Sequence, residues 1–248
     1  MPQKQGKFVW VELNTSNPKA AQSFYGEVLG WKVKAFPMGP QTYEMIDLGE
    51  TQIGGYNPIE GKGPAHWLSY MSVDSVDESA KKVAAAGGKV IDAPSDIPTV
   101  GRFSKVADPL GSVFYLFRSQ NPDPPEPPAL PGRFYWNENV TRDAAKAVAF
   151  YEKLFGYTHD EMPMPDGKYY VLKRGEDSLA GITTGKEKNA PPTWVPYFAV
   201  TDADAAAARA KKLGAQIFVA PEDIPNVGRF SVIGDPQGAV FGIIKPAR

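Results

Sequence analysis

The sequence predicts an α+β fold of four consecutive βαβββ modules, grouped in two domains. Three observations support this prediction. Residues 100–104 (VGRFS) and the DPLG turn at 108–111 recur 127 residues later as VGRFS and DPQG. An order of one strand, one helix and three strands occurs twice in each half of the chain. A segment containing six prolines, residues 119–132, separates the halves.

The repeated stretch has the composition of a β-hairpin. In Asp-Pro-x-Gly the proline fixes φ and the glycine takes the positive φ of a tight turn, and branched or aromatic residues flank it. Asp108 and Asp235 are therefore interpreted as turn residues and not as catalytic acids. The turn does not explain why Arg102 and Arg229 recur at the same distance before it. Both arginines are candidate ligand-binding residues.

The first module begins with an alternating strand. Trp10, Glu12 and Asn14 share one face, and the apolar residues between them share the other. A helix follows, with Pro18 in its first turn and Gly30 as its C-terminal stop. The strands of this module are expected at residues 8–14, 32–36, 42–48 and 52–56.

The second module restarts the same order. A strand from Trp67 to Val73 precedes a helix over residues 76–86, which Gly87 and Gly88 close. Its other strands are expected at residues 89–92, 102–107 and 113–117. The second half repeats both modules, with an offset of 126 for the first and 127 for the second. A fourth helix is expected over residues 203–213.

The proline-rich segment predicts the domain boundary. Proline cannot continue a helix or lie inside a sheet, so we expect a semi-rigid, extended tether. The predicted domains are residues 1–118 and 133–248, joined by a linker at 119–132. Each domain is long enough to bury its own core.

Composition excludes several functions. A formal net charge of −1 gives no basic field for nucleic acid or an anionic membrane. The chain has no cysteine, which rules out disulfides, thiolate metal sites and thiol nucleophiles. No apolar run approaches the roughly 20 residues that span a bilayer, and no signal segment precedes the first strand. We expect a cytoplasmic protein.

The repeated modules resemble those of the vicinal oxygen chelate superfamily, which includes glyoxalase I, bleomycin-resistance proteins and extradiol dioxygenases. The resemblance rests on F-Y-x-x-x-x-G-[WY] early in each half and D-P-x-G late in each half. It implies two incomplete barrels, each with a concave cleft for a small molecule. It also implies, for many members, a divalent metal in that cleft.

The usual metal ligands are missing from this sequence. The aligned positions of the family's metal ligands are Trp10, Leu68 and Tyr115 in the first half and Trp136, Val195 and Gly242 in the second. None of these side chains offers an imidazole or a carboxylate. We therefore expect no cofactor, although His66, two residues before Leu68, leaves a displaced metal site open. His159 is expected to be an ordinary surface histidine.

The residues that remain in the expected clefts are mostly aromatic. Glu12 and Glu138 are the two repeated carboxylates, and they are candidate general bases if burial raises their pKa values. Alternatively, they form structural ion pairs with Arg102 and Arg229. The candidate ligand-binding residues are Trp10, Asn14, Tyr70, Arg102 and Tyr115 in the first half, and Trp136, Tyr197 and Arg229 in the second.

The two clefts should differ. Asn14 is replaced by Val140, and Tyr115 by Gly242, so the second cleft is expected to be less polar and roomier near its rim. Other aromatic residues are expected in the core. These are Phe24, Tyr25, Trp67, Phe150, Tyr151 and Trp194.

Three functions compete. The first is a small-molecule-binding protein that works without a metal, as the bleomycin-resistance resemblance implies. The second is an enzyme, either a glyoxalase-like lyase or isomerase, or a dioxygenase-type enzyme, with Glu12 or Glu138 as base or with a displaced metal. The third is an interaction protein with vestigial clefts. The expected partner is a small molecule, and the expected state is a monomer or a loose homodimer.

Overall fold

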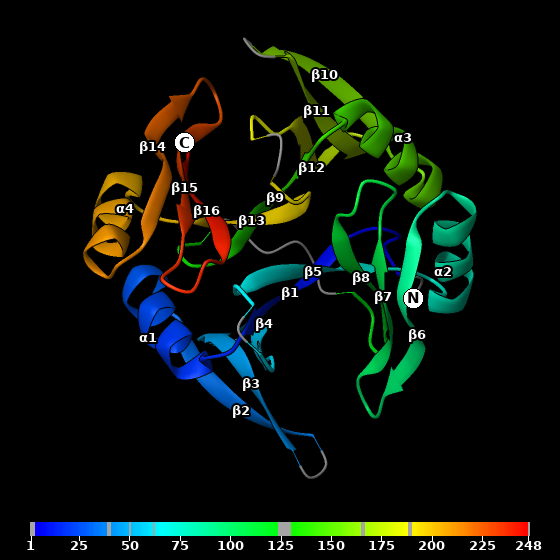
Figure 1. Ribbon diagram of the computed structural model, residues 1–248, viewed down its shortest axis with the longest axis horizontal. Coiled ribbons are helices and arrows are strands. Elements are labelled where there is room, and N and C mark those ends of the chain that lie inside the picture. Colours follow the sequence, from blue (N-terminus) through cyan, green and yellow to red (C-terminus); the bar gives the residue numbers. More distant parts are fainter. Residues whose placement is uncertain are drawn as a thin grey trace. The chain divides into compact units, whose positions relative to one another are not determined.

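The computed structural model describes residues 3–38, 41–49, 51–61, 63–123, 130–164, 167–187 and 190–247. Over these residues the chain repeats one βαβββ module four times (Figure 1). The predicted α+β class and the tandem modules are confirmed. Residues 124–129 of the expected linker lie outside the described residues.

The modules follow one another along the chain. The first module contains β1 (Phe8–Thr15), α1 (Pro18–Leu29), β2 (Lys32–Met38), β3 (Gln41–Leu48) and β4 (Thr51–Pro58). The second contains β5 (His66–Ser72), α2 (Val76–Ala85), β6 (Lys89–Ile97), β7 (Gly101–Ala107) and β8 (Val113–Ser119). The third contains β9 (Phe134–Thr141), α3 (Ala144–Phe155), β10 (Thr158–Met164), β11 (Gly167–Arg174) and β12 (Asp177–Thr184). The fourth contains β13 (Thr193–Ala199), α4 (Ala203–Lys212), β14 (Gln216–Ile224), β15 (Gly228–Gly234) and β16 (Val240–Pro246).

The strands form two eight-stranded sheets, each from two consecutive modules. The strand orders are β2-β3-β4-β1-β5-β8-β7-β6 and β10-β11-β12-β9-β13-β16-β15-β14. In each module the first strand pairs in parallel with the last, and the last three strands form antiparallel hairpins. β6 runs to Ile97, five residues past the expected end at Asp92. Register shifts on either side of Asp92 accommodate Pro94, which cannot donate to a ladder.

Packing of the helices defines two compact units, named here for their place in the sequence. The inner unit combines the second and third modules, with residues 3–9, 69–123 and 136–194. The outer unit combines the first and fourth modules, with residues 10–68, 130–135 and 195–247. Helix α2 contacts α3 in the inner unit, and α1 contacts α4 in the outer unit. A domain division at the proline-rich segment stays a prediction.

The ends of the predicted linker are held by hydrogen bonds. Asp123 accepts from the hydroxyl of Ser72 at 2.8 Å and from the backbone N–H of Lys4 at 2.7 Å. At the other end, the carbonyl of Gly132 accepts from Nε1 of Trp31 at 2.7 Å. Both described ends of the segment are therefore fixed to the compact units.

The helix boundaries follow from capping residues. Asn17 accepts a hydrogen bond from the backbone N–H of Ala20, and Gly30 ends α1 with φ of 75°. Asp143 and Gly156 have the same roles at the ends of α3. An asparagine or aspartate side chain satisfies a free N–H at the first turn, and glycine accepts the left-handed conformation after the last. The predicted starts and stops are confirmed.

A buried hydrogen-bond chain links tryptophan, tyrosine and aspartate in each unit. In the outer unit Trp67 Nε1 donates to Tyr25 at 3.1 Å, and the Tyr25 hydroxyl donates to Asp235 at 3.0 Å. Trp194, Tyr151 and Asp108 form the same chain in the inner unit, at 2.9 and 3.1 Å. Burial and the neighbouring aspartate raise the pKa of both tyrosines, so both remain donors.

These chains confirm the core predictions for the aromatic residues. Phe24 and Phe150, beside the tyrosines, are also buried. The second oxygen of Asp108 accepts three backbone N–H groups of its turn, and that of Asp235 accepts two. The aspartates are turn residues, as predicted, and also connect each turn to a helix of another module.

Candidate functional site

A hydrogen-bond network of tryptophan, tyrosine and glutamate occurs once in each unit. In the first network, in the outer unit, Trp10 Nε1 donates to the Tyr43 hydroxyl at 3.2 Å, and this hydroxyl donates to Glu12 at 2.9 Å. In the second network, in the inner unit, Trp136 Nε1 donates to the Tyr169 hydroxyl at 3.0 Å. Tyr169 also hydrogen-bonds Glu138. Each network includes a glutamate carboxylate.

Strand alternation places these side chains on the sheet face opposite the helices. Val11 and Leu13 of β1 belong to the helix-covered core, so Trp10 and Glu12 point to the other face. This confirms the predicted alternation of the first strand. Glu12 is 6% exposed, whereas Trp10 and Tyr43 are half-buried.

A glycine on the strand next to each tyrosine makes room for the network. A Cβ on Gly55 would overlap the phenol of Tyr43, and a Cβ on Gly181 would overlap the phenol of Tyr169. Any larger residue would displace the tyrosine hydroxyl from its bonds. Glycine at both positions is therefore part of the site's geometry.

The tyrosine has a defined protonation state in the second network. Burial, and then the charge of Glu138, raise the pKa of Tyr169 well above its ordinary value. Tyr169 therefore stays protonated at neutral pH and donates a hydrogen bond to Glu138. A hydrogen bond donated to a carboxylate favours the charged form of that carboxylate. The network thus places a carboxyl acceptor near an indole ring.

The first network has an additional amide pair. Asn57 Nδ2 donates to Asn14 Oδ1 at 2.7 Å. Asn14 is 2% exposed, and its own Nδ2 has no hydrogen-bond partner among the described residues. The corresponding residues of the inner unit are Val140 and Thr183. The first network is therefore the more polar of the two, as the sequence predicts.

Tyr70 and Tyr115 lie together in a separate aromatic cluster of the inner unit. Their rings stack with centroids 4.3 Å apart. Phe103 contacts Tyr115 with centroids 5.9 Å apart, and the Lys105 ammonium lies 5.9 Å from the Tyr115 centroid. Stacked rings with a cation nearby make a compact, mostly closed surface.

Tyr197 lies against Gly242 in the outer unit. The two residues are paired in the β13–β16 register, and a Cβ on Gly242 would overlap the Tyr197 ring. The expectation of more room at Gly242 is wrong, because the Tyr197 ring takes the space that a side chain would occupy.

Arg102 and Arg229 do not join these networks. Arg102 donates two hydrogen bonds to Asp77, at 2.8 and 2.9 Å, and one to Asp96 at 2.9 Å. Arg229 binds Asp204 in the same way, at 2.6 and 2.8 Å. The guanidinium groups lower the pKa values of Asp77 and Asp204.

This geometry corrects one interpretation of the arginines. Val106 lies in the core beneath α2, and strand alternation puts Arg102 on that same helix-covered face. The suggested ion pairs with Glu12 and Glu138 are therefore wrong, since the partners are aspartates near the first turns of α2 and α4 and on β6 and β14.

The aligned metal positions have no ligand chemistry. Leu68 and Val195 are buried apolar residues. His66 is exposed beside the carbonyl of Pro64, and His159 contacts Glu152 at 2.8 Å. Among the described residues, no group of three or more histidine, aspartate or glutamate side chains is arranged to hold a metal ion.

Sequence reasoning missed Tyr43 and Tyr169. A signal was present, because the two tyrosines and the two glycines, Gly55 and Gly181, each recur at the offset of 126 that relates Trp10 to Trp136. Tyrosine is common in strands, so recurrence alone did not separate a network residue from a packing residue.

Comparisons with known proteins agree with this architecture. CFP32 of Mycobacterium tuberculosis (strain CDC 1551 / Oshkosh), provisionally named a glyoxylase, is 38% identical over 252 residues, covering 98% of this chain and 96% of CFP32. The anthracycline biosynthesis protein DnrV of Streptomyces peucetius is 30% identical over 257 residues, covering 97% of this chain and 93% of DnrV.

Solved structures share the fold at lower identity. The Mn(II)-bound glyoxalase from Novosphingobium aromaticivorans superposes with a TM-score of 0.69 at 17% identity, covering 98% of this chain and 82% of that one. The 2,2',3-trihydroxybiphenyl 1,2-dioxygenase from Sphingomonas wittichii also gives 0.69, at 15% identity, covering 97% and 90%.

None of the described helices has the length and apolar character needed to cross a membrane. The model of one family, described as the Glyoxalase/Bleomycin resistance protein/Dioxygenase superfamily, matches residues 7–116 and 138–243, which takes in parts of all four modules. The chain belongs to this superfamily.

Proposed function

We propose that the chain binds a small, flat aromatic molecule at each Trp–Tyr–Glu network, without the divalent metal of many family members. The repeated hydrogen-bond chain, from indole N–H through phenol to carboxylate, carries this proposal. The indole offers a surface for stacking. The glutamate carboxylate is a hydrogen-bond acceptor that suits a ligand hydroxyl.

The family's metal does not fit the residues at the aligned positions. Trp10, Leu68 and Tyr115, and their counterparts in the second half, carry neither imidazole nor carboxylate. A single glutamate in each network supplies one ligand where a catalytic site normally supplies three. We therefore assign ligand binding to rings and hydrogen bonds.

The names of two relatives support different functions, one the binding of a flat ligand and the other catalysis. DnrV is named for anthracycline biosynthesis, which supports a polycyclic aromatic ligand for this chain. CFP32 is provisionally named a glyoxylase, which supports an enzyme. The networks suit the first possibility directly, because each combines a half-buried indole ring and a half-buried phenol with a carboxylate.

Titration with a matched pair of ligands tests the binding proposal. The probe is 2,6-dihydroxyanthraquinone, whose hydroxyl groups are too far from the quinone carbonyls to bond with them, and the control is anthraquinone, which has the same ring system without hydroxyl groups. Quenching of tryptophan fluorescence reports binding. We expect Glu12→Gln with Glu138→Gln to weaken binding of the dihydroxy compound about tenfold, the size of one hydrogen bond to a charged group.

The control ligand makes the result specific. Anthraquinone affinity should change little in the double variant, because the rings remain. Equal loss for both ligands would mean that the glutamates only support the structure. No binding of either ligand by the unaltered protein would reject the proposed ligand class.

The second candidate function is proton transfer by Glu12 or Glu138. Its supporting observation is the tyrosine that donates to the carboxylate and orients it in a half-buried site. Such a carboxylate can take a proton from carbon beside a carbonyl group, the step of a glyoxalase-type isomerase. The test is conversion of a 2-oxoaldehyde hemithioacetal. Loss of this conversion in Glu12→Gln and Glu138→Gln, with binding of the hemithioacetal retained, would favour this function.

A further inference from the structure

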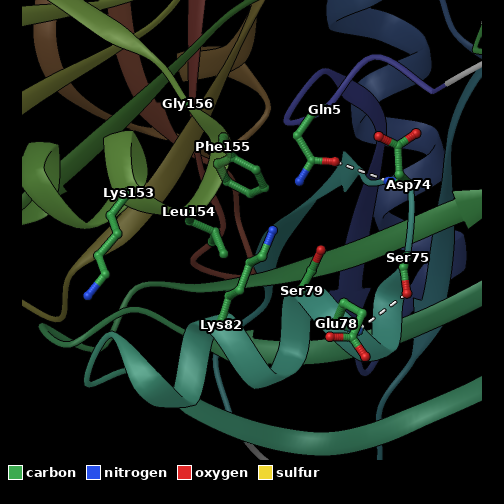
Figure 2. A pocket seen from close by; sticks show the side chains of 10 residues that line it. All are labelled: Gln5, Asp74, Ser75, Glu78, Ser79, Lys82, Lys153, Leu154, Phe155 and Gly156. Carbon is green, nitrogen blue, oxygen red and sulfur yellow. Dashed lines mark hydrogen bonds between the residues drawn. The ribbon is translucent and has the colours of Figure 1, made fainter.

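A polar pocket of about 390 Å³ lies in the inner unit, between the start of α2 and the end of α3 (Figure 2). It is lined by Gln5, Asp74, Ser75, Glu78, Ser79, Lys82 and the last residues of α3, from Lys153 to Gly156. The family networks described above use none of these residues. The volume is within the range of small-molecule pockets.

Three donors point into this pocket. Figure 2 shows the Lys82 ammonium, the Ser79 hydroxyl and the Gln5 amide nitrogen turned toward the same space, beside the Phe155 ring. The other end of the Gln5 amide is fixed, since its oxygen accepts the backbone N–H of Asp74 at 3.0 Å. The three groups therefore face the pocket as donors.

The donors lack protein partners. Ser79 is 3% exposed, yet its hydroxyl forms no hydrogen bond within the described part of the chain. Lys82 has no ion pair with any residue that the structure describes. A serine hydroxyl open to the pocket, next to an exposed ammonium that has no ion pair among the described residues, favours an anionic ligand.

The pocket's acidic residues limit the charge of that ligand. Glu78 pairs with Lys81 at 2.8 Å, and Asp74 accepts the backbone N–H of Gln3 at 3.2 Å. Both carboxylates stay near the rim and would repel a dianion such as phosphate. A single negative charge with an apolar body suits the donors and the Phe155 ring.

The outer unit provides an internal control, because the corresponding donors are absent or used. Ser79 corresponds to Ala206, and Gln5 to Pro131. Lys82 corresponds to Arg209, whose Nη1 donates to the carbonyl of Glu27 at 3.0 Å, in the last turn of α1. Arg209 thus hydrogen-bonds from α4 to α1, whereas Lys82 of α2 forms no such bond to the described residues of α3.

We propose that this pocket of the inner unit binds a small aromatic monocarboxylate, with the carboxylate between Lys82, Ser79 and Gln5 and the ring against Phe155. This site is independent of the Trp–Tyr–Glu networks. Its occupation would add a ligand-mediated link between α2 and α3, which already contact each other in the inner unit.

Amide NMR of the full chain with benzoate as the probe tests this proposal. Benzoate should shift the Gln5 side-chain amide and the backbone signals of Ser79 and Lys82, in a saturable way. Benzamide, the neutral isostere, should leave them in place, and inorganic phosphate should bind more weakly than benzoate. Equal responses to benzoate and benzamide, or stronger binding of phosphate, would overturn the proposed ligand class.

Two variants test the residues. Ser79→Ala introduces the residue that α4 already carries at this position, so the fold should persist while benzoate affinity falls about tenfold. Lys82→Arg keeps the charge but should bridge to the carbonyl of Lys153, as Arg209 does to Glu27, and so close the pocket. Lys81→Ala, on the outer side of the same helix, is the matched control. Unchanged benzoate affinity in both Ser79→Ala and Lys82→Arg would reject the site.

Discussion

The inner and outer units share a helix pair and a buried Trp–Tyr–Asp chain, but the residues around that chain differ in polarity. On the helix-covered face of β1 the outer unit has Val11 and Leu13. The same positions on β9 of the inner unit hold Asn137 and Asn139, both fully buried. The comparison shows that the Trp–Tyr–Asp chain accompanies either an apolar or a polar interior.

Some buried amide atoms of the inner unit have no hydrogen-bond partner among the described residues. Asn137 donates to the Ser69 hydroxyl at 2.6 Å, but both amide atoms of Asn139 lack a partner among the described residues. A buried amide without a partner costs free energy on folding. We therefore expect the inner unit to contribute less to the free energy of unfolding than the outer unit.

Exchanging the apolar and polar residues at Leu13 and its counterpart Asn139 should give the largest effect on the free energy of unfolding. Leu13→Asn places an amide in an apolar core, so we expect a loss of about 3–5 kcal/mol in the free energy of unfolding. Asn139→Leu should instead cost nothing or add about 1 kcal/mol. Urea denaturation measures both. A loss of more than about 2 kcal/mol in Asn139→Leu would show that the Asn139 amide is satisfied in the folded protein.

The glycines beneath the tyrosines should give the next largest effect. Gly55→Ala and Gly181→Ala each displace a phenol, and we expect a loss of about 1–3 kcal/mol in the free energy of unfolding. Binding of 2,6-dihydroxyanthraquinone should fall in both. Gly63→Ala, at a glycine with open space around its Cβ position, is the matched control. Full binding by both Ala variants would disprove the role of the tyrosines.

The Asn14–Asn57 amide pair should make ligand affinity differ between the first and second networks. We expect Asn14→Val to weaken binding at the first network about fivefold, and Val140→Asn to strengthen binding at the second by less, because Thr183 replaces Asn57 there. Isothermal titration that gives two identical sites in the unaltered protein would contradict this asymmetry.

The turn aspartate of the outer unit should give a pH-dependent effect. Burial raises the pKa of Asp235 above its ordinary value of 3.8 in the folded state. Its contribution to stability is therefore present below the unfolded pKa and decreases as pH rises through the folded pKa. Asp235→Asn removes this titration, so it should destabilise the protein more at pH 4 than at pH 7. Urea denaturation at both values measures the difference, and the opposite order would refute the assignment.

The arginine clamps should give the smallest effect. Arg102 and Arg229 are about one-third exposed, and their aspartate partners are more exposed still. Ion pairs of this kind contribute little and are screened by salt. We expect Arg102→Ala to alter neither the thermal midpoint in high salt nor the binding of 2,6-dihydroxyanthraquinone. Weaker binding in this variant would restore Arg102 as a ligand-binding residue.

Much of the fold followed from local signals. Gly30 and Gly156 mark helix ends, and the Asp-Pro-x-Gly turns mark hairpins, because each depends on the backbone preferences of a few residues. The grouping of the second module with the third, and of the first with the fourth, could not be predicted from local signals, because it depends on which helices pack together. The alternation of β1 placed Trp10 and Glu12 correctly. Tyr43 reaches them across the sheet from β3, a contact that no local pattern specifies.

The pairing of the first module with the fourth has a consequence for the order of folding. In the inner unit, Tyr151 and Asp108 are 43 residues apart, so this core can form once the third module has been made. In the outer unit, Tyr25 and Asp235 are 210 residues apart. Contacts over such a separation form late, because the loop must close before they stabilise it. During synthesis, Tyr25 and the α1 face around it must wait for the last module, and this face is where a chaperone would be needed most.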